Sequence, residues 1–210
     1  MPKCDHNYLK YYKPEEGDTI IDLGASLGEF EDDNYKVLKD DNCFIVCVEP
    51  TLWCVERLIP FMKSRFDENK FMILSTGTYK YNSCALFNNT SAHVLNCSDV
   101  STETMSKYDV HSNKVLTPVI TLDTVIDIVN FEIDFVKCDI EGSELETFLD
   151  CKNIRQIKNL AIASYHKRDN EETWIKLAPF FQQNGFDVTY DKEPYLDFEP
   201  QSMLYCKRKD

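Results

Sequence analysis

Short runs of apolar residues recur along this chain, and several of them end in an acidic or polar residue. Runs without regular polar interruption are typical of strands that are buried on both faces of a parallel sheet. Stretches with the period of a helix separate the runs, and this alternation predicts an α/β fold with a doubly wound, mostly parallel sheet. The predicted strands cover residues 19–23, 44–49, 71–75, 135–139 and 160–165.

Helical periodicity is clearest after Glu49. The positions expected to face the sheet there are Leu52, Val55, Leu58, Ile59, Met62 and Phe66. Pro60 is expected to kink this helix, because proline removes a backbone donor from the helix interior. A later helix is predicted over residues 171–183, and two strands are predicted over residues 186–190 and 203–206.

Residues 76–120 have a different pattern, with short alternating pieces that are rich in Gly, Asn, Ser and Thr. We expect a β-hairpin and loop inserted next to the main sheet here, not a separate domain. The whole chain has 210 residues, of which 43% are hydrophobic. A chain of this size can bury a sizeable core alone, so the expectation is one domain over residues 1–210.

A glycine-bracketed loop follows the first predicted strand. Its candidate ligand-binding residues are Asp22, Gly24, Ala25, Ser26 and Gly28. Glycine has no Cβ, so the backbone can turn sharply and approach a ligand closely. The G-x-x-x-G spacing lacks the tight G-x-G turn that seats a pyrophosphate. The loop therefore favours a cofactor without phosphates, and an aspartate behind it suits a positively charged one such as S-adenosylmethionine. A tight turn without any ligand is the alternative.

An acid also ends the second predicted strand. Glu49 lies 21 residues after Gly28, close to the spacing at which such a carboxylate accepts hydrogen bonds from ribose hydroxyls. Ligands of doubly wound sheets bind beyond the carboxyl ends of the strands. We therefore expect one rim to gather the ends of all the parallel strands, namely Asp22, Glu49 with Pro50, Ser75, Asp139, and Tyr165 with His166.

Four motifs together resemble a known family. They are D-L-G-A-x-x-G at 22–28, V-E-P at 48–50, T-L-D at 121–123 and D-F-V-K-x-D-I-E-G-x-E at 134–144. In order and spacing they resemble the FkbM family of S-adenosylmethionine-dependent methyltransferases, over most of the chain. The resemblance implies a Rossmann-like class I methyltransferase sheet closed by an antiparallel strand. It also implies methyl transfer, usually to a hydroxyl of a sugar or polyketide-like acceptor.

The segment after Gly28 departs from that family, which usually continues there with an apolar helix. The acids in this segment are Glu29, Glu31, Asp32 and Asp33. Acids suit the positive end of a helix dipole. They leave few apolar anchors, however, so we expect the first helix to start late or to pack loosely.

Methyl transfer to a hydroxyl requires positioning of the acceptor and removal of its proton. His166 is the candidate base, because imidazole titrates near neutral pH and the residue follows a central strand. Asp139 is expected to orient His166 or to take the proton itself. Glu141 is placed with them, in the loop that faces the methionine end of the cofactor. Ser143 and Glu146 have the spacing of a capping box, and His93 in the insertion is a candidate lid residue.

A divalent metal is a further candidate ligand. Asp139, Asp169 and Asn170 resemble the oxygen ligands with which cation-dependent O-methyltransferases hold Mg²⁺. The pair Asp169 and Asn170 is equally consistent with a turn or with the cap of the next helix.

Composition limits the setting and the partners. The formal charge of −13 argues against a nucleic-acid substrate, because lysine and arginine supply most of the affinity for phosphates. A small hydroxylated molecule fits better as the acceptor. No apolar run is long enough to span a membrane, and the N-terminus has no hydrophobic signal core, so we expect a cytoplasmic protein. Nine cysteines without a C-x-x-C pair indicate free thiols and not a zinc site.

Two alternatives remain open at this point. An N-methyltransferase of an amine or nucleic acid would usually carry an Asn- or Asp-Pro-Pro-aromatic loop where Asp139, Ile140, Glu141 and Gly142 stand, and this loop is absent. A cofactor-binding domain without turnover is the other alternative.

Overall fold

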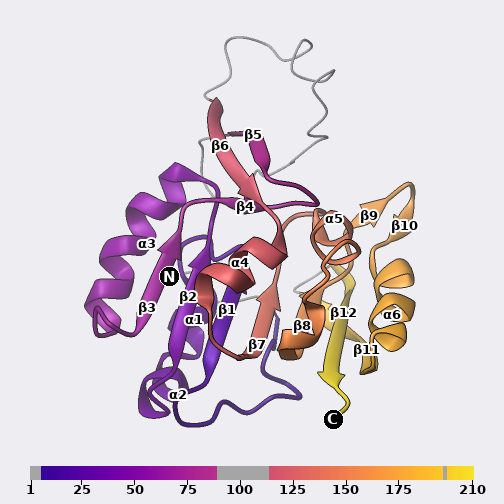
Figure 1. Ribbon diagram of the computed structural model, residues 1–210, viewed down its shortest axis with the longest axis horizontal. Coiled ribbons are helices and arrows are strands. Elements are labelled where there is room, and N and C mark those ends of the chain that lie inside the picture. Colours follow the sequence, from indigo (N-terminus) through magenta and orange to yellow (C-terminus); the bar gives the residue numbers. More distant parts are fainter. Residues whose placement is uncertain (1–5, 89–113, 196–197) are drawn as a thin grey trace.

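The structure is a computed structural model that describes residues 6–88, 114–195 and 198–210. Seven strands of this part form one sheet in the order β11-β12-β8-β7-β1-β2-β3 (Figure 1). Their bounds are β1 (Thr19–Leu23), β2 (Phe44–Val48), β3 (Phe71–Leu74), β7 (Ile133–Cys138), β8 (Ile157–Ala163), β11 (Phe186–Tyr195) and β12 (Phe198–Arg208). The first five are mutually parallel, whereas β12 is antiparallel to β8 and to β11. The predicted mostly parallel sheet with an antiparallel closing pair is confirmed.

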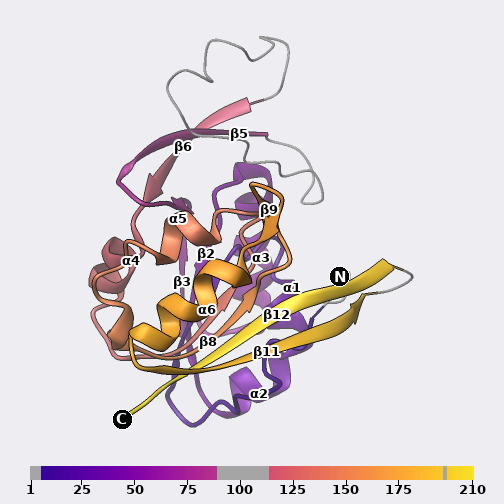
Figure 2. The ribbon, with the colours of Figure 1, turned by 90° about the vertical axis from the view of Figure 1, so that its right-hand side faces the viewer.

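Helices cover both faces of this sheet (Figure 2). Their bounds are α1 (Glu29–Asp33), α2 (Tyr35–Asp40), α3 (Leu52–Arg65), α4 (Leu122–Val129), α5 (Glu144–Phe148) and α6 (Trp174–Gln183). Side chains alternate along a strand, so Ile21 of β1 packs into the core under α4, α5 and α6, while Ile20 packs into the core under α1, α2 and α3. This two-sided burial explains the continuous apolar runs in the sequence.

A smaller sheet lies above the carboxyl ends of the main strands (Figure 1). In the described part it has the order β4-β6-β5, with β4 (Gly77–Thr78), β5 (Ser83–Asn88) and β6 (Lys114–Ile120). Strands β5 and β6 pair antiparallel at the two ends of the predicted insertion. Thr121 then caps α4, because its side chain accepts a hydrogen bond from the Thr124 amide.

Several predicted details of the helices are wrong. Helix α1 does not start late: it begins at Glu29 and packs through Phe30 and Glu31, which are both buried. Helix α3 continues past Pro60, and the kink there stays a prediction. The helix turns Leu52 and Ile59, each 40% exposed, away from the sheet. The residues it buries are Cys54, Val55, Leu58 and Met62.

The helix predicted over residues 171–183 begins only at Trp174. A short hairpin of β9 (Lys167–Arg168) and β10 (Glu171–Glu172) occupies the residues before it. Asp169 and Asn170 form its two-residue turn with φ angles of 52° and 67°. Aspartate and asparagine tolerate this left-handed conformation, which two-residue hairpin turns require.

The cysteines and the apolar character of the helices are the last features of the described residues that the sequence predicted. The seven cysteines in that part are all free thiols, and six of them are buried. None of the helices in that part has the length and apolar character that crossing a membrane requires.

Candidate active site

The loops that follow β1 and β7 are in close backbone contact at the carboxyl rim of the sheet. Gly24 has a φ of 83°, and a Cβ built on it would overlap the carbonyl oxygen of Asp139. Gly28 has a φ of 93°, and its Cβ would lie 2.5 Å from the ring of Phe61 on α3. Both glycines are therefore required by the local packing as well as by the backbone conformation.

Glu49 lies against the glycine loop. One oxygen of its carboxylate accepts a hydrogen bond from the Ser26 amide at 2.9 Å, and the other accepts one from the Thr51 amide at 2.7 Å. Its side chain is buried, and this burial raises the pKa of Glu49, although the two backbone donors oppose the shift. The structure thus brings Glu49 to Ser26 of the glycine loop, and Pro50 is half-buried. The contact of Glu49 with a ribose stays a prediction.

Asp22 faces a cation that belongs to the chain itself. Its carboxylate is fully buried and lies 2.7 Å from Nζ of Lys137, its register partner on β7. The same ammonium group donates a hydrogen bond to the carbonyl oxygen of Gly24 at 2.8 Å. Lys137 therefore links the two strands and holds the first carbonyl of the glycine loop. Sequence reasoning missed this residue, although a lysine inside an apolar strand was a visible signal.

A second buried acid lies beside this pair. Glu31 of α1 is fully buried, and its carboxylate accepts a hydrogen bond from Sγ of Cys47 at 3.3 Å. Burial raises the pKa of Glu31 well above its usual value, and the charge of Asp22 raises it further. The raised pKa favours the neutral form of Glu31, and Lys137 is the cation beside Asp22.

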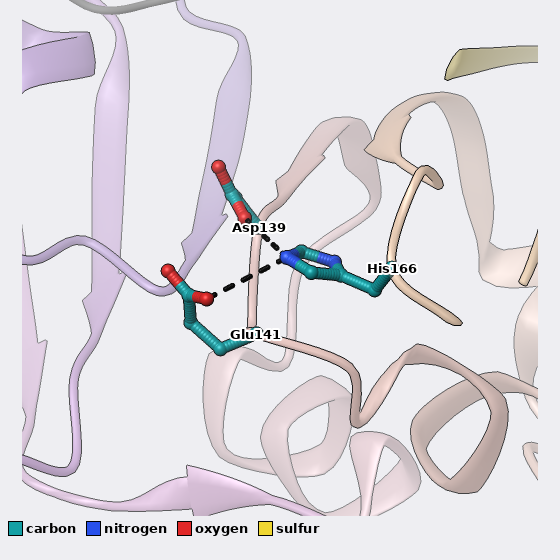
Figure 3. A group of neighbouring side chains, drawn as sticks. All are labelled: Asp139, Glu141 and His166. Atoms are coloured by element: carbon teal, nitrogen blue, oxygen red, sulfur yellow. Dashed lines mark ion pairs between the residues drawn. The ribbon is translucent and has the colours of Figure 1, made fainter. Parts of the chain in front are cut away.

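Asp139, Glu141 and His166 come together at the rim (Figure 3). The first two belong to the loop between β7 and α5, and His166 follows β8. Nε2 of His166 lies 3.9 Å from Oδ1 of Asp139 and 3.6 Å from Oε2 of Glu141. Glu141 has a φ of 55°, a left-handed conformation that a glutamate rarely adopts. The predicted catalytic residues thus form one cluster.

A fourth group, Glu144, contacts the other side of the imidazole. Its Oε1 lies 2.8 Å from Nδ1 of His166, an ion-pair contact and not an aligned hydrogen bond. Burial by itself lowers the pKa of His166, but the carboxylates of Glu144, Glu141 and Asp139 outweigh it and raise that pKa to about 11. With only these neighbours, His166 keeps its proton at neutral pH. That state is the opposite of what the predicted general base needs, and Asp139 is the remaining candidate proton acceptor.

The N-terminal segment also reaches the site, which sequence reasoning did not foresee. The hydroxyl of Tyr8 donates a hydrogen bond to Oδ2 of Asp139 at 2.9 Å, and the Tyr8 ring is buried. His6 is buried next to it, with its ring 5.6 Å from that of Tyr165. No local motif marks these residues, because their contacts join segments that are more than 100 residues apart.

Other predicted site residues lie elsewhere. Ser75 follows β3 and is exposed. Asp169 lies at the hairpin turn with its side chain 92% exposed, and the described His, Cys, Asp and Glu atoms that gather around Asp139 do not include it. Asn170, the other residue of this turn, is also exposed. The candidate lid residue His93 lies outside the described residues.

The predicted capping box is also wrong. The side chain of Ser143 makes no capping hydrogen bond at the start of α5. Glu146 instead pairs with Arg168 of the hairpin, with an Oε1 to Nη2 distance of 2.6 Å. A tertiary ion pair therefore replaces the local contact that the spacing suggested.

The sheet order, the antiparallel closing pair and the loops at the carboxyl rim define a class I methyltransferase fold. The model of the methyltransferase FkbM domain matches residues 22–188. This chain belongs to the FkbM methyltransferase family. A comparison with curated proteins finds no match.

Solved structures agree with this fold. The chain is similar to the methyltransferase FkbM of Methylobacillus flagellatus KT, with 17% identity, a TM-score of 0.64 and coverage of 94% of this chain and 47% of that one. It thus spans about half the length of that protein. It is also similar to Aeropyrum pernix fibrillarin with natively bound S-adenosyl-L-methionine, with 11% identity, a TM-score of 0.57 and coverage of 94% and 70%. It is similar as well to M. capricolum TrmK in complex with S-adenosyl-homocysteine, with 10% identity, a TM-score of 0.52 and coverage of 93% of this chain and 64% of that one.

Proposed function

We propose that this chain is an S-adenosylmethionine-dependent O-methyltransferase that acts on a hydroxyl group of a small molecule or sugar. The observation that carries the proposal is the position of Asp139. Its backbone carbonyl lies against Gly24 of the glycine loop, and its carboxylate already accepts a hydrogen bond from a hydroxyl group, that of Tyr8. An acceptor hydroxyl needs the same kind of partner next to the cofactor.

The residues at the rim fit S-adenosylmethionine. The glycine loop offers a close backbone approach without the tight turn that a pyrophosphate needs. Each oxygen of Glu49 accepts one amide hydrogen bond and has a further lone pair for a ribose hydroxyl. When bound, the cofactor supplies an electrophilic methyl group. Lys137 holds the carbonyl of Gly24 in the loop by a hydrogen bond. Asp139 accepts a hydrogen bond from the acceptor hydroxyl and then takes its proton.

The chemistry of the chain favours a small acceptor. A formal charge of −13 gives little attraction to a nucleic acid, since such binding depends on lysine and arginine at the phosphates. The loop Asp139-Ile140-Glu141-Gly142 supplies carboxylates, which suit a hydroxyl donor. Magnesium held by Asp139 with Asp169 and Asn170 is not part of the proposal, because the hairpin turn presents Asp169 to solvent. The cytoplasm remains the expected location.

Isothermal calorimetry of the purified chain with S-adenosylmethionine and S-adenosylhomocysteine tests the cofactor. We expect micromolar binding of both and, for Glu49→Ala, an affinity about tenfold or more lower, because the ribose loses its charged partner. Glu68→Ala is the matched control, since Glu68 is exposed and pairs with the exposed Lys63 at 3.1 Å. Absence of cofactor binding would refute the proposal.

Methyl transfer is measured next, with a cofactor labelled in its methyl group and a panel of sugars and other hydroxylated compounds. We expect a labelled product whose methyl group is on oxygen. We also expect that Asp139→Asn keeps cofactor binding and slows transfer, because an amide cannot take the hydroxyl proton. Cofactor binding without any product across the panel would favour the alternative of a binding domain without turnover. Methylated nitrogen in the product would favour the N-methyltransferase.

A further inference from the structure

The cluster of Asp139, Glu141 and His166 holds its ligand atoms at ion-pair distances (Figure 3). One oxygen or nitrogen atom from each residue lies within 4.8 Å of the other two. The separations from Nε2 of His166 are 3.6 Å to Glu141 and 3.9 Å to Asp139. Both exceed the length of a hydrogen bond. The three side chains therefore surround a point that none of them fills.

Two of these atoms are also buried without a hydrogen bond. Oδ1 of Asp139 and Nε2 of His166 have no such partner in the part of the chain that the structure describes. Buried polar atoms nearly always have a hydrogen-bond partner, because leaving a buried donor or acceptor without one costs about 1–3 kcal/mol. Both atoms therefore keep the capacity to bind a ligand at the point that the three side chains surround.

A metal ion has the size that the spacing requires. A divalent ion binds nitrogen and oxygen ligands at about 2.0–2.2 Å, so two ligands of one ion lie roughly 3–4 Å apart. The measured separations of 3.6 and 3.9 Å fall in this range. A carboxylate-rich environment also favours a cation, because the buried Glu144 adds a third acid next to the same imidazole.

The residues behind the cluster have the arrangement of outer-shell partners. The histidines that bind metals commonly have a carboxylate at the ring nitrogen that does not face the metal. Oε1 of Glu144 takes this place, 2.8 Å from Nδ1 of His166. The Tyr8 hydroxyl similarly bonds the second oxygen of Asp139 and leaves Oδ1 for the shared point. These contacts turn the remaining atom of each ligand toward the others.

From this geometry we infer that Asp139, Glu141 and His166 bind one divalent first-row transition-metal ion, of the Mn²⁺ or Zn²⁺ type. One imidazole nitrogen with two carboxylate oxygens suits such ions better than Mg²⁺, which prefers oxygen ligands alone. The role of the ion rests on the proposed function: it holds the acceptor hydroxyl and lowers the pKa of that hydroxyl.

Metal binding can be measured without any methyl transfer. The full chain is stripped with EDTA and titrated with Mn²⁺ while electron paramagnetic resonance follows free Mn²⁺; Zn²⁺ is then added as a competitor. We expect one Mn²⁺ per chain, displaced by Zn²⁺. Glu141→Gln and His166→Gln should each weaken binding by about tenfold or more. The matched control is Asp169→Asn on the exposed turn, which should bind Mn²⁺ like the wild type.

Glu141→Gln is the decisive variant because this side chain is 45% exposed and is expected to fold normally, which circular dichroism checks. If neither metal binds to the wild type, or if Glu141→Gln and His166→Gln bind as tightly as the wild type, the inference is wrong. Calorimetry with S-adenosylmethionine on the same metal-free sample is a separate test. Cofactor binding without metal binding would refute the metal site alone, whereas metal binding without cofactor binding would refute the proposed function alone.

Discussion

Two groups of charged side chains lie near the end of β7, one at Lys137 and the other at Asp139, and they differ in how their charge is balanced. Below the glycine loop, the buried Asp22 has the ammonium group of Lys137 at 2.7 Å, and burial raises the pKa of the neighbouring Glu31. At the rim, three carboxylates surround the single imidazole of His166, whose Nε2 reaches none of them within hydrogen-bond distance. The chain thus places a cation in direct contact with Asp22 in the first group, whereas in the second group Nε2 of His166 stands 3.6 Å from Glu141 and 3.9 Å from Asp139.

This difference separates structural from functional charge. A buried ion pair with its own cation holds two strands together. A cluster whose facing nitrogen and oxygen atoms are not within hydrogen-bond distance of one another can still bind a ligand. This cluster lies at the edge of the sheet where ligands bind in this architecture. Variants of the first group should therefore change stability, and variants of the second should change binding and turnover.

The largest effect is expected for Lys137→Met. The substitution removes the ammonium group and leaves the Asp22 carboxylate buried without its cation, which costs about 3–5 kcal/mol of unfolding free energy. Urea denaturation measures the loss. Lys63→Met is the control, because the pair of Lys63 with Glu68 is exposed and its removal should leave the unfolding free energy unchanged. Equal stability of Lys137→Met and wild type would show that the first group is not structural.

Gly24→Ala should have the next largest effect. Its Cβ would overlap the Asp139 carbonyl oxygen, so the loop after β7 would have to move. Gly17→Ala is a close match, because Gly17 has a φ of 84° and no atom within 4 Å of the added Cβ. Gly17→Ala should cost only the backbone strain, about 1–2 kcal/mol. Gly24→Ala should cost clearly more in thermal unfolding and should also weaken S-adenosylmethionine binding; similar losses for the two variants would contradict this.

Glu31→Gln tests the raised pKa of Glu31 through the pH dependence of stability. Burial raises the pKa of Glu31 in the folded state, so the contribution of Glu31 to stability is full below its unfolded pKa near 4.5 and is lost as the pH rises toward the folded value. Glutamine has no such loss. The variant should gain on the wild type as pH rises from 5 to 8, by at most about 1.4 kcal/mol per pH unit. Denaturation at several pH values checks this, and a constant difference would indicate an ionised Glu31.

The smallest effect is expected for Tyr8→Phe, which removes one hydrogen bond to Asp139 at the rim. We expect a loss of about 1 kcal/mol in unfolding free energy. Binding of S-adenosylmethionine should be unchanged, because Tyr8 contacts Asp139, which the proposed function assigns to the acceptor hydroxyl and not to the cofactor. Tyr11→Phe is the control, since the Tyr11 side chain is 55% exposed and its bond to Asp191 lies at the surface. A weaker cofactor affinity in Tyr8→Phe would place the N-terminal segment in the cofactor site.

Local patterns predicted the parts of the molecule that local physics governs. Apolar runs marked the five parallel strands, because a strand covered on both faces needs apolar residues throughout. Acids at the ends of those strands marked the rim, and the spacing from Gly28 to Glu49 placed a carboxylate that the structure brings to Ser26. Glycines at 24 and 28 were readable because a left-handed turn favours a residue without a Cβ.

The sequence by itself therefore determined the sheet, the family and the residues at the carboxyl ends of its strands. Only the tertiary structure decided which partners those residues have. Lys137 on β7 pairs with Asp22 on the neighbouring strand β1, and Tyr8 near the N-terminus bonds Asp139. Glu146 pairs with Arg168 instead of capping its own helix. The physical reason is that a periodic pattern reports burial along one element, whereas an ion pair or a metal-type cluster depends on where separate elements pack in space.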